Sequence, residues 1–266
     1  MQGRVLVVAG SDSGGGAGIQ ADIKTITALG GYAATAVTAL TAQNTLGVQA
    51  VQAIDPAFVE QQILAVLSDI GADVIKIGML GNVDMVHTVS LVLEAKAQAK
   101  PVVLDPVMVA KGGHSLLHDD AVNALKTHMI PHAFLLTPNI PEAEVLTGHT
   151  IAGPDDMAKA GLVLLEMGAE NVLIKGGHLE GELLTDLLVT PHGNTAYEAV
   201  RLDSKHTHGT GCTLASASAV GLAQGADLPT AIATARAYVR EAIRTAPGLG
   251  QGHGPLNHGH VQNTKG

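Results

Sequence analysis

The sequence predicts an α/β protein whose central, mostly parallel sheet is covered on both faces by helices. Short runs of aliphatic and β-branched residues alternate along the chain with longer segments rich in alanine and leucine. Each short run is apolar without a break, which is typical of strands that are buried on both faces. Strands and helices that alternate in this way form βαβ units, and such units build a parallel sheet.

Six short runs are expected to form the strands of this sheet. They are residues 4–9, 32–37, 74–78, 102–105, 133–137 and 171–175. The intervening helices are predicted at residues 17–29, 56–70, 84–97, 119–129 and 154–167. Asp55 before Pro56 is a typical helix start, because aspartate caps the first turn and proline is tolerated at the first helical position. Glycines at positions 30, 71, 148 and 168 stand where helices are expected to end.

The pattern changes toward the C-terminal end of the chain. Residues 182–190 and 195–200, on either side of a turn, predict an antiparallel hairpin, and two helices are expected at 211–224 and 228–245. Because no linker, charge run or internal repeat interrupts the sequence, residues 1–266 are interpreted as one domain. The Gly/His-rich residues 248–266 are expected to form a surface tail, since their histidines are irregularly spaced and lack neighbouring carboxylates or cysteines.

Composition excludes several classes of protein. The chain has 266 residues, a formal net charge of −9, two Phe, three Tyr and one Cys. Few aromatic residues and an acidic balance argue against a nucleic-acid partner. One cysteine cannot form an intrachain disulfide. No apolar run approaches the roughly 20 residues that span a bilayer, and the first residues do not resemble a signal peptide, so a cytoplasmic protein with no membrane partner is expected.

Residues 10–22 form a glycine-rich segment directly after the first predicted strand. Ligands of parallel sheets bind beyond the carboxyl ends of the strands, so this segment is an expected binding loop. Its residues 16–21, GAGIQA, are a variant of the dinucleotide-binding fingerprint. That fingerprint needs an acidic residue about 20 positions further on. Residues 38–41 are TALT and the next acid is Asp55, so a nicotinamide oxidoreductase is the weaker alternative.

The same segment does not form a nucleotide-binding P-loop, because none of its glycines is followed by lysine. A flexible turn that leads into a helix would explain the glycines without any ligand. Asp12 and Asp22 flank the turn, however, and polar side chains beside a hollow lined by backbone suit a small polar ligand.

A second glycine-rich turn, residues 207–212 (THGTGC), precedes an apolar helix. Gly209 and Gly211 permit close approach of the backbone, and the N–H groups of a helix start attract an anion such as a phosphoryl group. Cys212 at this helix start is expected to have a lowered pKa. It would otherwise be a buried packing residue. A Cys/His hydrolase that uses the nearby histidines ranks lower, because neighbours in sequence rarely meet at one substrate atom.

Polar side chains also follow three other predicted strands. Asp105, Asn139 and Glu142 supply the oxygen ligands that Mg²⁺ prefers. Lys175 ends a further strand and is able to neutralise a polyphosphate. Carboxylates for a metal ion, a cation and an anion-binding helix start at one sheet edge are the parts that phosphoryl transfer requires.

Seven motifs carry a resemblance that covers nearly the whole chain. They are AGSDSGGGAGIQADIKT (9–25), TALTAQNTLGV (38–48), KIGML (76–80), LDPVMVAKGG (104–113), TPNIPEAEVL (137–146), IKGGH (174–178) and HGTGCTLASA (208–217). In this order they resemble the bacterial hydroxymethylpyrimidine kinase/phosphomethylpyrimidine kinase family of thiamine biosynthesis, which belongs to the ribokinase-like superfamily. The resemblance implies a three-layer αβα sandwich, a cytoplasmic location and a homodimer.

The resemblance also implies the reaction and the substrate site. The enzyme would use ATP and Mg²⁺ to phosphorylate 4-amino-5-hydroxymethyl-2-methylpyrimidine, and then phosphorylate the monophosphate to the pyrophosphate. Gln43 would hydrogen-bond the ring nitrogen and the amino group of this small-molecule substrate, because an amide both accepts and donates. The residues that would shape the rest of the pocket are Gly10, Asp22, Met79 and Val107.

The catalytic residues that the resemblance implies lie in the other loops. Gly209, Thr210, Gly211 and Cys212 would form the anion hole, and Cys212 stands where many sugar kinases of the superfamily have an aspartate base. In the same way, Asn139 and Glu142, with Asp105 nearby, would organise Mg²⁺, and Lys175 would approach the ATP phosphates. A thiol must first lose its proton to act as a base, so the anion hole is the firmer expectation.

Two alternatives to this function remain. A pyridoxal kinase would bind a hydroxymethyl pyridine, which lacks the adjacent amino group that Gln43 would recognise. Gln43 and Met79 therefore favour the aminopyrimidine. A ligand sensor without catalysis would be expected to lose Lys175, Glu142 or Cys212, and all three are present.

Overall fold

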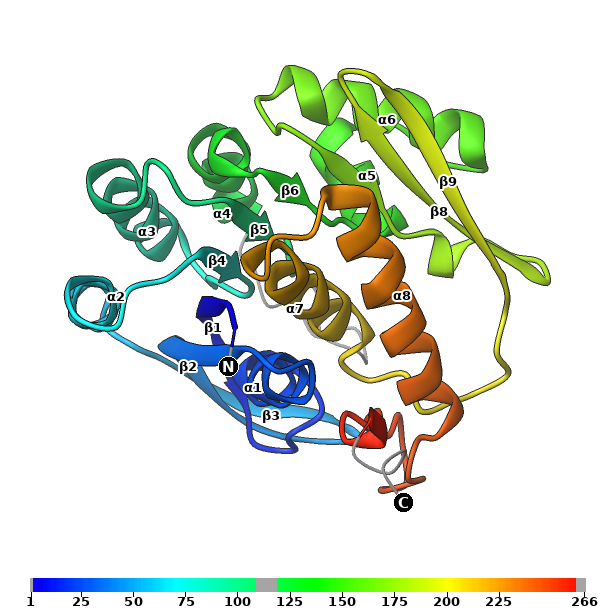
Figure 1. Cartoon of the computed structure of the whole chain (residues 1–266), viewed down its shortest axis with the longest axis horizontal. Helices are drawn as coiled ribbons and strands as arrows, with labels where there is room; N and C mark the ends of the chain where they lie inside the picture. The colour runs from blue at the N-terminus through cyan, green and yellow to red at the C-terminus, as the bar shows by residue number, and fades with distance from the viewer. Residues whose placement is uncertain (1, 109–118, 262–266) are drawn as a thin grey trace.

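A computed structural model describes residues 2–108 and 119–261. Within them, nine strands form one sheet in the order β3-β2-β1-β4-β5-β6-β7-β8-β9 (Figure 1). The strands are β1 (Arg4–Asp12), β2 (Tyr32–Asn44), β3 (Gly47–Ala53), β4 (Val74–Ile77), β5 (Val102–Leu104), β6 (Leu135–Leu136), β7 (Val172–Ile174), β8 (Leu183–Thr190) and β9 (Gly193–Val200). All six strands predicted for the parallel sheet are therefore present.

The pairing of the strands confirms the mostly parallel sheet. Pairs from β2 through β1, β4, β5 and β6 to β7 are parallel. At one end β3 pairs with β2 in the antiparallel sense, and at the other β8 and β9 form the predicted hairpin. Strand β3 was not predicted, and β2 was predicted to end at residue 37, whereas β2 continues to Asn44 and pairs with β3 there.

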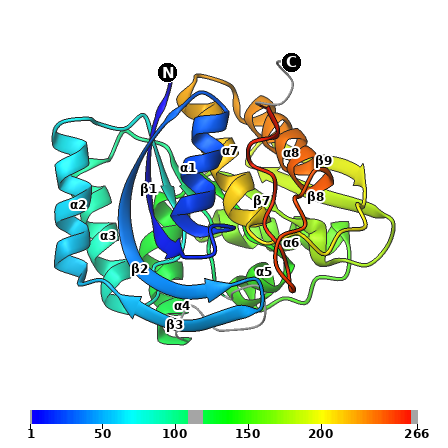
Figure 2. The ribbon, with the colours of Figure 1, turned by 90° about the horizontal axis from the view of Figure 1, so that it is seen from below.

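Helices cover both faces of the sheet, so the fold has three layers (Figures 1 and 2). Helices α1 (Gly18–Ala28), α7 (Thr210–Ala223) and α8 (Leu228–Arg244) lie on one face. The other face carries α2 (Pro56–Ser68), α3 (Val83–Lys96), α4 (Asp119–Ala124), α5 (Ile140–Thr147) and α6 (Pro154–Glu166). Short helical turns lie at Leu125–Met129, Ile130–His132 and Gly176–His178.

The core is divided by the sheet, and β1 shows how. Val5 and Val7 pack with the α1, α7 and α8 layer, whereas Leu6 and Val8 pack with the opposite layer. Successive side chains of a strand point to opposite faces, so a strand covered on both sides needs apolar residues at every position. Each such buried side chain stabilises the fold by about 1.5–3 kcal/mol.

Side-chain caps set where several helices begin. Asp55 accepts a hydrogen bond from the Ala57 N–H at 2.8 Å, which confirms the predicted start of α2. Helix α5 was not predicted, although its start carries a capping box. Asn139 accepts from the Glu142 N–H at 2.9 Å, and Glu142 accepts from the Asn139 N–H at 2.8 Å. This reciprocal pair fixes both side chains at the carboxyl end of β6.

The C-terminal segment is not a surface tail, so that prediction is wrong for residues 254–260. Leu256, His258 and His260 are only 3%, 5% and 9% exposed. The Tyr238 hydroxyl donates to the His258 carbonyl at 2.6 Å, and the His208 N–H donates to the Gly254 carbonyl at 3.2 Å. The segment therefore packs against α8 and against the turn before α7.

Two other expectations about the whole chain stay predictions. One sheet runs through the parts of the chain that the structure describes, which agrees with the interpretation as one domain. Among the described residues, no helix combines the length and the hydropathy that a membrane crossing requires. The expected cytoplasmic location stays a prediction. Part of the motif at 104–113 lies outside the described residues.

Candidate active site

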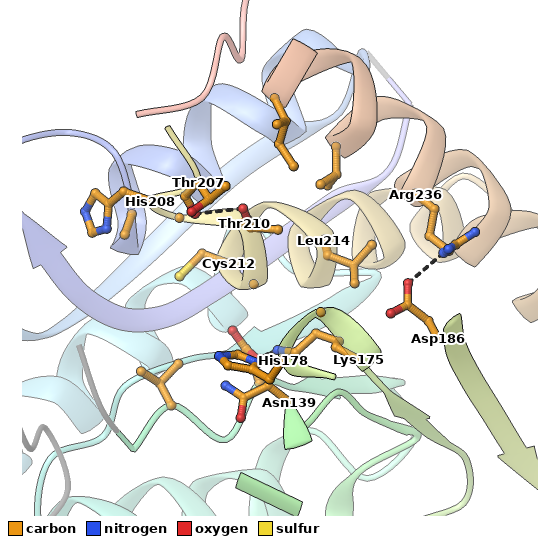
Figure 3. Close-up of a pocket in the computed structure, with 18 of the residues that line it drawn as sticks. Asn139, Lys175, His178, Asp186, Thr207, His208, Thr210, Cys212, Leu214 and Arg236 are labelled. Carbon is orange, nitrogen blue, oxygen red and sulfur yellow. Dashed lines mark hydrogen bonds and ion pairs between the residues drawn. The ribbon is translucent and has the colours of Figure 1, made fainter. Parts of the chain in front are cut away.

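A cavity of about 1720 Å³ opens at the carboxyl ends of the parallel strands and at the start of α7 (Figure 3). It brings together nearly all of the residues predicted for the site. The predicted residues that line it are Gly10, Gln43, Met79, Asp105, Val107, Asn139, Glu142, Lys175, Gly209, Thr210, Gly211 and Cys212. The exception among the predicted residues is Asp22, which does not line the cavity.

Lys175, Asp105 and Glu142 form a charged cluster on the floor of this cavity. The Lys175 Nζ atom lies 2.9 Å from Asp105 Oδ1 and 3.9 Å from Glu142 Oε2. Burial alone would lower the pKa of Lys175, but Asp105 and Glu142 outweigh it and raise this pKa. Lys175 is therefore a firmly protonated cation at the end of β7.

The Glu142 carboxyl group is held in an unusual electrostatic environment. Burial and the neighbouring Asp105 raise the pKa of Glu142 to about 7, although Lys175 and the Asn139 N–H oppose this rise. One lysine neutralises only part of the negative charge of these two carboxylates, so a second cation would be favoured beside them. Two carboxylates of this kind, with phosphate oxygens and water, are a usual ligand set for Mg²⁺.

Asp105 and Glu142 thus fit a magnesium ion, and Asn139 fits it less well. The Asn139 side-chain oxygen already accepts the Glu142 N–H at 2.9 Å, so its main role in the structure is to cap α5. Among the described residues, no group of three or more histidine, cysteine and acidic side chains is arranged as a metal site. Oxygen atoms of a bound nucleotide would be needed to complete the coordination.

The turn before α7 is shaped by two glycines. Gly209 has φ +85°, and a β-carbon at this position would collide with the Gly16 carbonyl oxygen. A β-carbon at Gly211 would lie 3.2 Å from Lys175 Nζ and 3.5 Å from Asp105 Oδ2. The first turn of α7 therefore lies directly beside the charged cluster. The N–H groups of a helix start and a lysine ammonium group are both suited to an anion, and here they lie side by side.

Cys212 lies in that first helical turn, but its pKa is not lowered as the sequence analysis expected. Burial, together with Asp22 and Asp105, raises the pKa of the Cys212 thiol to about 11, although Lys76 and the Gly18 N–H oppose this effect. The expected thiolate character is therefore wrong for the ligand-free protein. The N–H groups of a helix start lower the pKa of a thiol, but burial and the surrounding carboxylates outweigh this effect at Cys212.

Asp22 lies behind the cavity wall. Its two carboxylate oxygens each accept a hydrogen bond from Lys76 Nζ at 3.0 Å, and Ser216 donates to one of them at 2.7 Å. Neither the Asp22 nor the Lys76 side chain has any exposed surface. The prediction that Asp22 shapes the substrate pocket by direct contact is corrected: Asp22 anchors Lys76, which itself lines the cavity.

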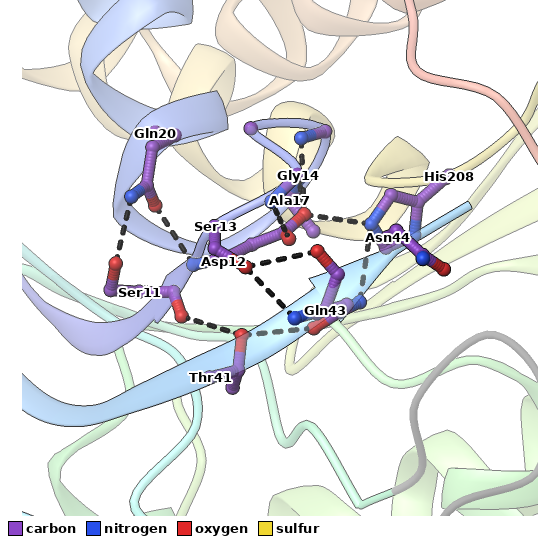
Figure 4. A network of polar contacts seen from close by, with 12 residues as sticks. Ser11, Asp12, Ser13, Gly14, Ala17, Gln20, Thr41, Gln43, Asn44 and His208 are labelled. Atoms are coloured by element: carbon purple, nitrogen blue, oxygen red, sulfur yellow. Dashed lines mark hydrogen bonds and ion pairs between the residues drawn. The ribbon is translucent and has the colours of Figure 1, made fainter. Parts of the chain in front are cut away.

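Asp12 connects the two glycine-rich segments (Figure 4). Its carboxylate accepts from the N–H groups of Gly14, Gly16 and Ala17 at 2.8–3.0 Å, and His208 Nε2 lies 2.8 Å away. Burial disfavours the charge, but the His208 and Ala17 hydrogen bonds outweigh burial and lower the pKa of Asp12. Sequence reasoning noted both residues without pairing them, because they are far apart along the chain.

Gln43 lies beside this network at the end of β2, and it lines the cavity. Gln43 Nε2 lies 3.3 Å from His208 Nε2, and Gln43 Oε1 lies 3.3 Å from Thr41 Oγ1. Nearby, Gly10 leaves room for Met79, whose terminal methyl group would overlap a β-carbon at position 10. An amide and a thioether wall thus occupy the part of the cavity next to the first glycine-rich segment.

Residues 12–257 match the model of the phosphomethylpyrimidine kinase family. The chain belongs to the phosphomethylpyrimidine kinase family. This result confirms the resemblance that the motifs predicted, and the match extends from Asp12 of the first glycine-rich segment into the buried C-terminal segment.

Relatives of the family agree with this assignment. The chain is 52% identical over 97% of its length to the thiamine biosynthesis bifunctional protein ThiED of Geobacter sulfurreducens, and it spans about half (52%) of that longer relative. It is 48% identical to the hydroxymethylpyrimidine/phosphomethylpyrimidine kinase of Bacillus subtilis, with 96% of this chain and 94% of the relative covered.

A solved structure confirms the predicted α/β, ribokinase-like fold. The structure of Bacillus subtilis pyridoxal kinase in complex with ADP superimposes with a TM-score of 0.91 and 36% sequence identity. The alignment covers 98% of this chain and 99% of that one. Sequence relatives of the phosphomethylpyrimidine kinase family and a pyridoxal kinase thus share one architecture.

Two side chains that the sequence analysis missed line the far part of the cavity. Arg236 of α8 donates to Asp186 of β8 at 2.7 Å and to the Tyr197 carbonyl at 2.8 Å (Figure 3). Asp186 also accepts the Gly176 N–H at 2.9 Å, so it fixes the turn that follows Lys175. Neither residue belongs to a motif that the sequence analysis used for the phosphomethylpyrimidine kinase family, and no local sequence signal pairs them.

Proposed function

We propose that the protein uses ATP to phosphorylate 4-amino-5-hydroxymethyl-2-methylpyrimidine and then the resulting monophosphate, a reaction pair of thiamine biosynthesis. The family match and the names of the relatives support this proposal. The structural observation that carries it is the common cavity of Gln43, which suits an aminopyrimidine, and the turn 209–212 beside Lys175, which suits a phosphoryl group.

Charge neutralisation is the main contribution of the proposed catalytic residues. Phosphoryl transfer spreads negative charge over the moving group, and catalysis depends on groups that are positioned to meet this charge. Lys175 and the N–H groups at the start of α7 would stabilise it from one side. Asp105 and Glu142 would hold Mg²⁺, which supplies further positive charge to the nucleotide phosphates when it is bound.

Cys212 would lie where the substrate hydroxyl loses its proton. Because the pKa of its thiol is raised to about 11, Cys212 keeps its own proton near neutral pH and is not ready to accept another. Proton transfer late in the reaction is compatible with a loose transition state, in which the phosphoryl group departs before the new bond is complete. We therefore propose Cys212 as a residue of the anion hole first. It would act as a proton acceptor only as the thiolate, after its own proton has passed to solvent.

The proposed function is tested by ATP consumption with the purified chain, Mg²⁺ and the hydroxymethylpyrimidine. Two successive phosphorylations are expected, seen by mass spectrometry of the products. Replacing Lys175 by methionine should lower the turnover about 100-fold, the usual cost of one donor at a transferring anion. Lys159→Met, at a lysine whose side chain is 71% exposed, is the matched control. No phosphorylation of the pyrimidine by the unaltered protein would refute the proposal.

A pyridoxal kinase is the second candidate, and the superposition on such an enzyme favours it. The same assay with pyridoxal in place of the pyrimidine separates the two. A clearly higher kcat/KM for pyridoxal would make the second candidate the correct one. The Gln43 amide argues for the pyrimidine, because the amide has a donor and an acceptor for adjacent groups of the ring.

We also propose that the protein forms a homodimer. Leu40, Leu46 and Val51 on β2, β3 and the turn between them are 45–66% exposed, and a second copy of the chain would cover such apolar side chains. Light scattering coupled to size-exclusion chromatography measures the mass. A single species near the monomer mass of 27.0 kDa at micromolar concentration would contradict the proposal.

A further inference from the structure

The orientation of the Gln43 amide can be worked out from the groups around it (Figure 4). Gln43 lies between Thr41 Oγ1 and His208 Nε2, each 3.3 Å from one end of the amide. The oxygen and nitrogen of an amide have nearly the same shape, so only their hydrogen-bond partners distinguish the two orientations. The donor and acceptor states of Thr41 and His208 therefore decide which end is which.

His208 must present a proton at Nε2. That atom lies 2.8 Å from Asp12 Oδ2, and the Asp12 carboxylate already accepts three backbone N–H groups. A carboxylate that collects donors in this way is ionised and only accepts. Nε2 of His208 therefore donates, whether the ring is neutral or charged. Because Nε2 carries the proton that it donates to Asp12, it has no lone pair left to accept an amide N–H. The Gln43 atom that faces it is therefore the amide oxygen.

The hydrogen bonds of Thr41, at the other end of the Gln43 amide, lead to the same orientation. Its hydroxyl group has one proton, and it donates that proton to the Ser11 carbonyl at 2.9 Å. A carbonyl oxygen only accepts, so the direction of this hydrogen bond is fixed. Thr41 Oγ1 is then left as an acceptor toward Gln43. The Gln43 atom that faces Thr41 must be the amide nitrogen.

We infer that His208 and Thr41 together fix the Gln43 amide, with its oxygen toward His208 and its nitrogen toward Thr41, and thereby determine which pyrimidine edge the enzyme accepts. This orientation exchanges the two amide atoms relative to the structure, in which Nε2 lies 3.3 Å from His208 Nε2 and Oε1 lies 3.3 Å from Thr41 Oγ1. This inference rests on the proposed function, and it assigns His208 and Thr41 as positioning residues. Neither of them needs to touch the reacting atoms. They act by fixing which side of the Gln43 amide offers the hydrogen-bond acceptor and which side offers the donor.

The fixed order matches one edge of the proposed substrate. A 4-aminopyrimidine presents a ring nitrogen that accepts, an amino group that donates, and then the 5-hydroxymethyl group. Pairing with Gln43 puts the amino group on the His208 side, so the hydroxymethyl group lies beyond it, toward the turn at 209–212. The opposite amide orientation would turn the hydroxymethyl group toward Thr41, away from that turn.

The same order rejects the 4-oxo analogue, 5-hydroxymethyl-2-methylpyrimidin-4-one. Its ring N–H donates and its carbonyl accepts. The ring N–H would therefore face the amide N–H of Gln43, and the carbonyl would face the amide oxygen. An amide that is free to rotate would accommodate either ring, whereas an amide held at both ends accommodates one. Discrimination between the two rings therefore reports directly on whether the amide is fixed.

The test measures kcat/KM for the 4-amino and the 4-oxo alcohol with the full-length protein and ATP-Mg²⁺. Thr41→Val removes the hydroxyl group with little change of shape, and Thr41→Ser keeps it. His208→Leu removes the donor, and His208→Gln places an N–H donor at a similar distance. We expect the Val and Leu variants to lower the amino-to-oxo ratio by about tenfold, the effect of one hydrogen bond, mainly through KM of the pyrimidine. The Ser and Gln variants should keep the ratio near that of the unaltered protein.

Other measurements separate this result from a general structural defect. KM for ATP should stay unchanged in every variant, and thermal unfolding shows whether each variant folds. If His208→Leu does not fold, the Thr41 pair still decides. An unchanged amino-to-oxo ratio in folded Thr41→Val would overturn the inference. Failure of the unaltered protein to phosphorylate the amino compound would instead refute the proposed function.

Discussion

Lys76 and Asp22 form an ion pair at 3.0 Å in which neither side chain has exposed surface. Burial is the largest influence on both groups, and their mutual attraction opposes it. The pKa of Lys76 is raised because Asp22 outweighs the effect of burial, so the lysine stays charged beneath the cavity. The cost of burying each charge is thus offset mainly by the opposite charge of its partner.

Removing one member of this pair should therefore be strongly destabilising. Lys76→Met leaves the Asp22 carboxylate buried without its cation, and we expect the free energy of unfolding to fall by about 3–5 kcal/mol. The double variant Lys76→Met/Asp22→Leu should lose less. Urea unfolding measures the change, with the exposed Lys159→Met as control. If Lys76→Met lowers the free energy of unfolding no more than Lys159→Met does, the buried charges of Lys76 and Asp22 do not depend on each other.

The raised pKa of Cys212 predicts slow alkylation. Only the thiolate reacts, and a pKa of about 11 leaves a small thiolate fraction at pH 8. Iodoacetamide should modify the folded protein at least about tenfold more slowly than the urea-unfolded chain at the same pH. The rate should still be rising between pH 9 and pH 10. Because the chain has one cysteine, the intact mass follows this site alone. A plateau near pH 8 would contradict the raised pKa.

Replacement of Cys212 tests its proposed contribution to turnover. Cys212→Ala should lower kcat by at least about tenfold if the Cys212 thiolate accepts the substrate proton during the reaction, since general bases contribute at least this much. Cys212→Ser keeps a small polar group and serves as the matched variant. Steady-state kinetics at saturating ATP gives the comparison. Unchanged turnover in the alanine variant would remove the proton-acceptor role and leave the anion-binding turn intact.

His258 predicts an acid-sensitive stability. Burial, with the nearby positive charges of Lys24 and His260, lowers its pKa to about 4 in the folded protein. The unfolded chain takes up this proton near pH 6.5, so the stability due to His258 is present above pH 6.5 and is lost as the pH falls toward 4. The change is on the order of 2–3 kcal/mol.

The measurement is urea unfolding of the unaltered protein and of His258→Gln between pH 7 and pH 4. Glutamine does not titrate in this range, so the variant should show a shallower loss of stability on acidification. His253→Gln, at an exposed histidine of the same segment, is the control and should follow the unaltered protein. Parallel pH curves for unaltered protein and His258→Gln would contradict the prediction.

Most strands could be predicted from the sequence because each is buried on both faces. β3 could not, because it lies at the sheet edge with most of its side chains exposed, and its sequence GVQAVQA shows neither an apolar run nor a period of two. Helix α5 was missed for another reason. Its eight residues are few, and a helix-capping acid and an Asn turn were weighed only as separate alternatives to metal ligands at Glu142 and Asn139, not as one capping box.

The candidate site was predicted residue by residue, but not in its contacts. Strand ends identified Asp105 and Lys175, because the loops that follow parallel strands meet at one sheet edge. The pairing of Lys76 with Asp22 was not predictable, since 54 positions separate the two residues. The pKa of Cys212 was predicted in the wrong direction, because the helix start is visible in the sequence whereas the surrounding carboxylates are not.

The hydrogen bond from His208 to Asp12 spans 196 positions of the chain. We expect contacts of such long range to form late, because the chain must first lose the entropy of closing a large loop. The substrate pocket is therefore completed only when both ends of the polypeptide have found their places around the sheet. Recovery of enzyme activity after dilution from urea should follow the slowest step of refolding, and a partly refolded chain would have secondary structure but no ability to bind the pyrimidine.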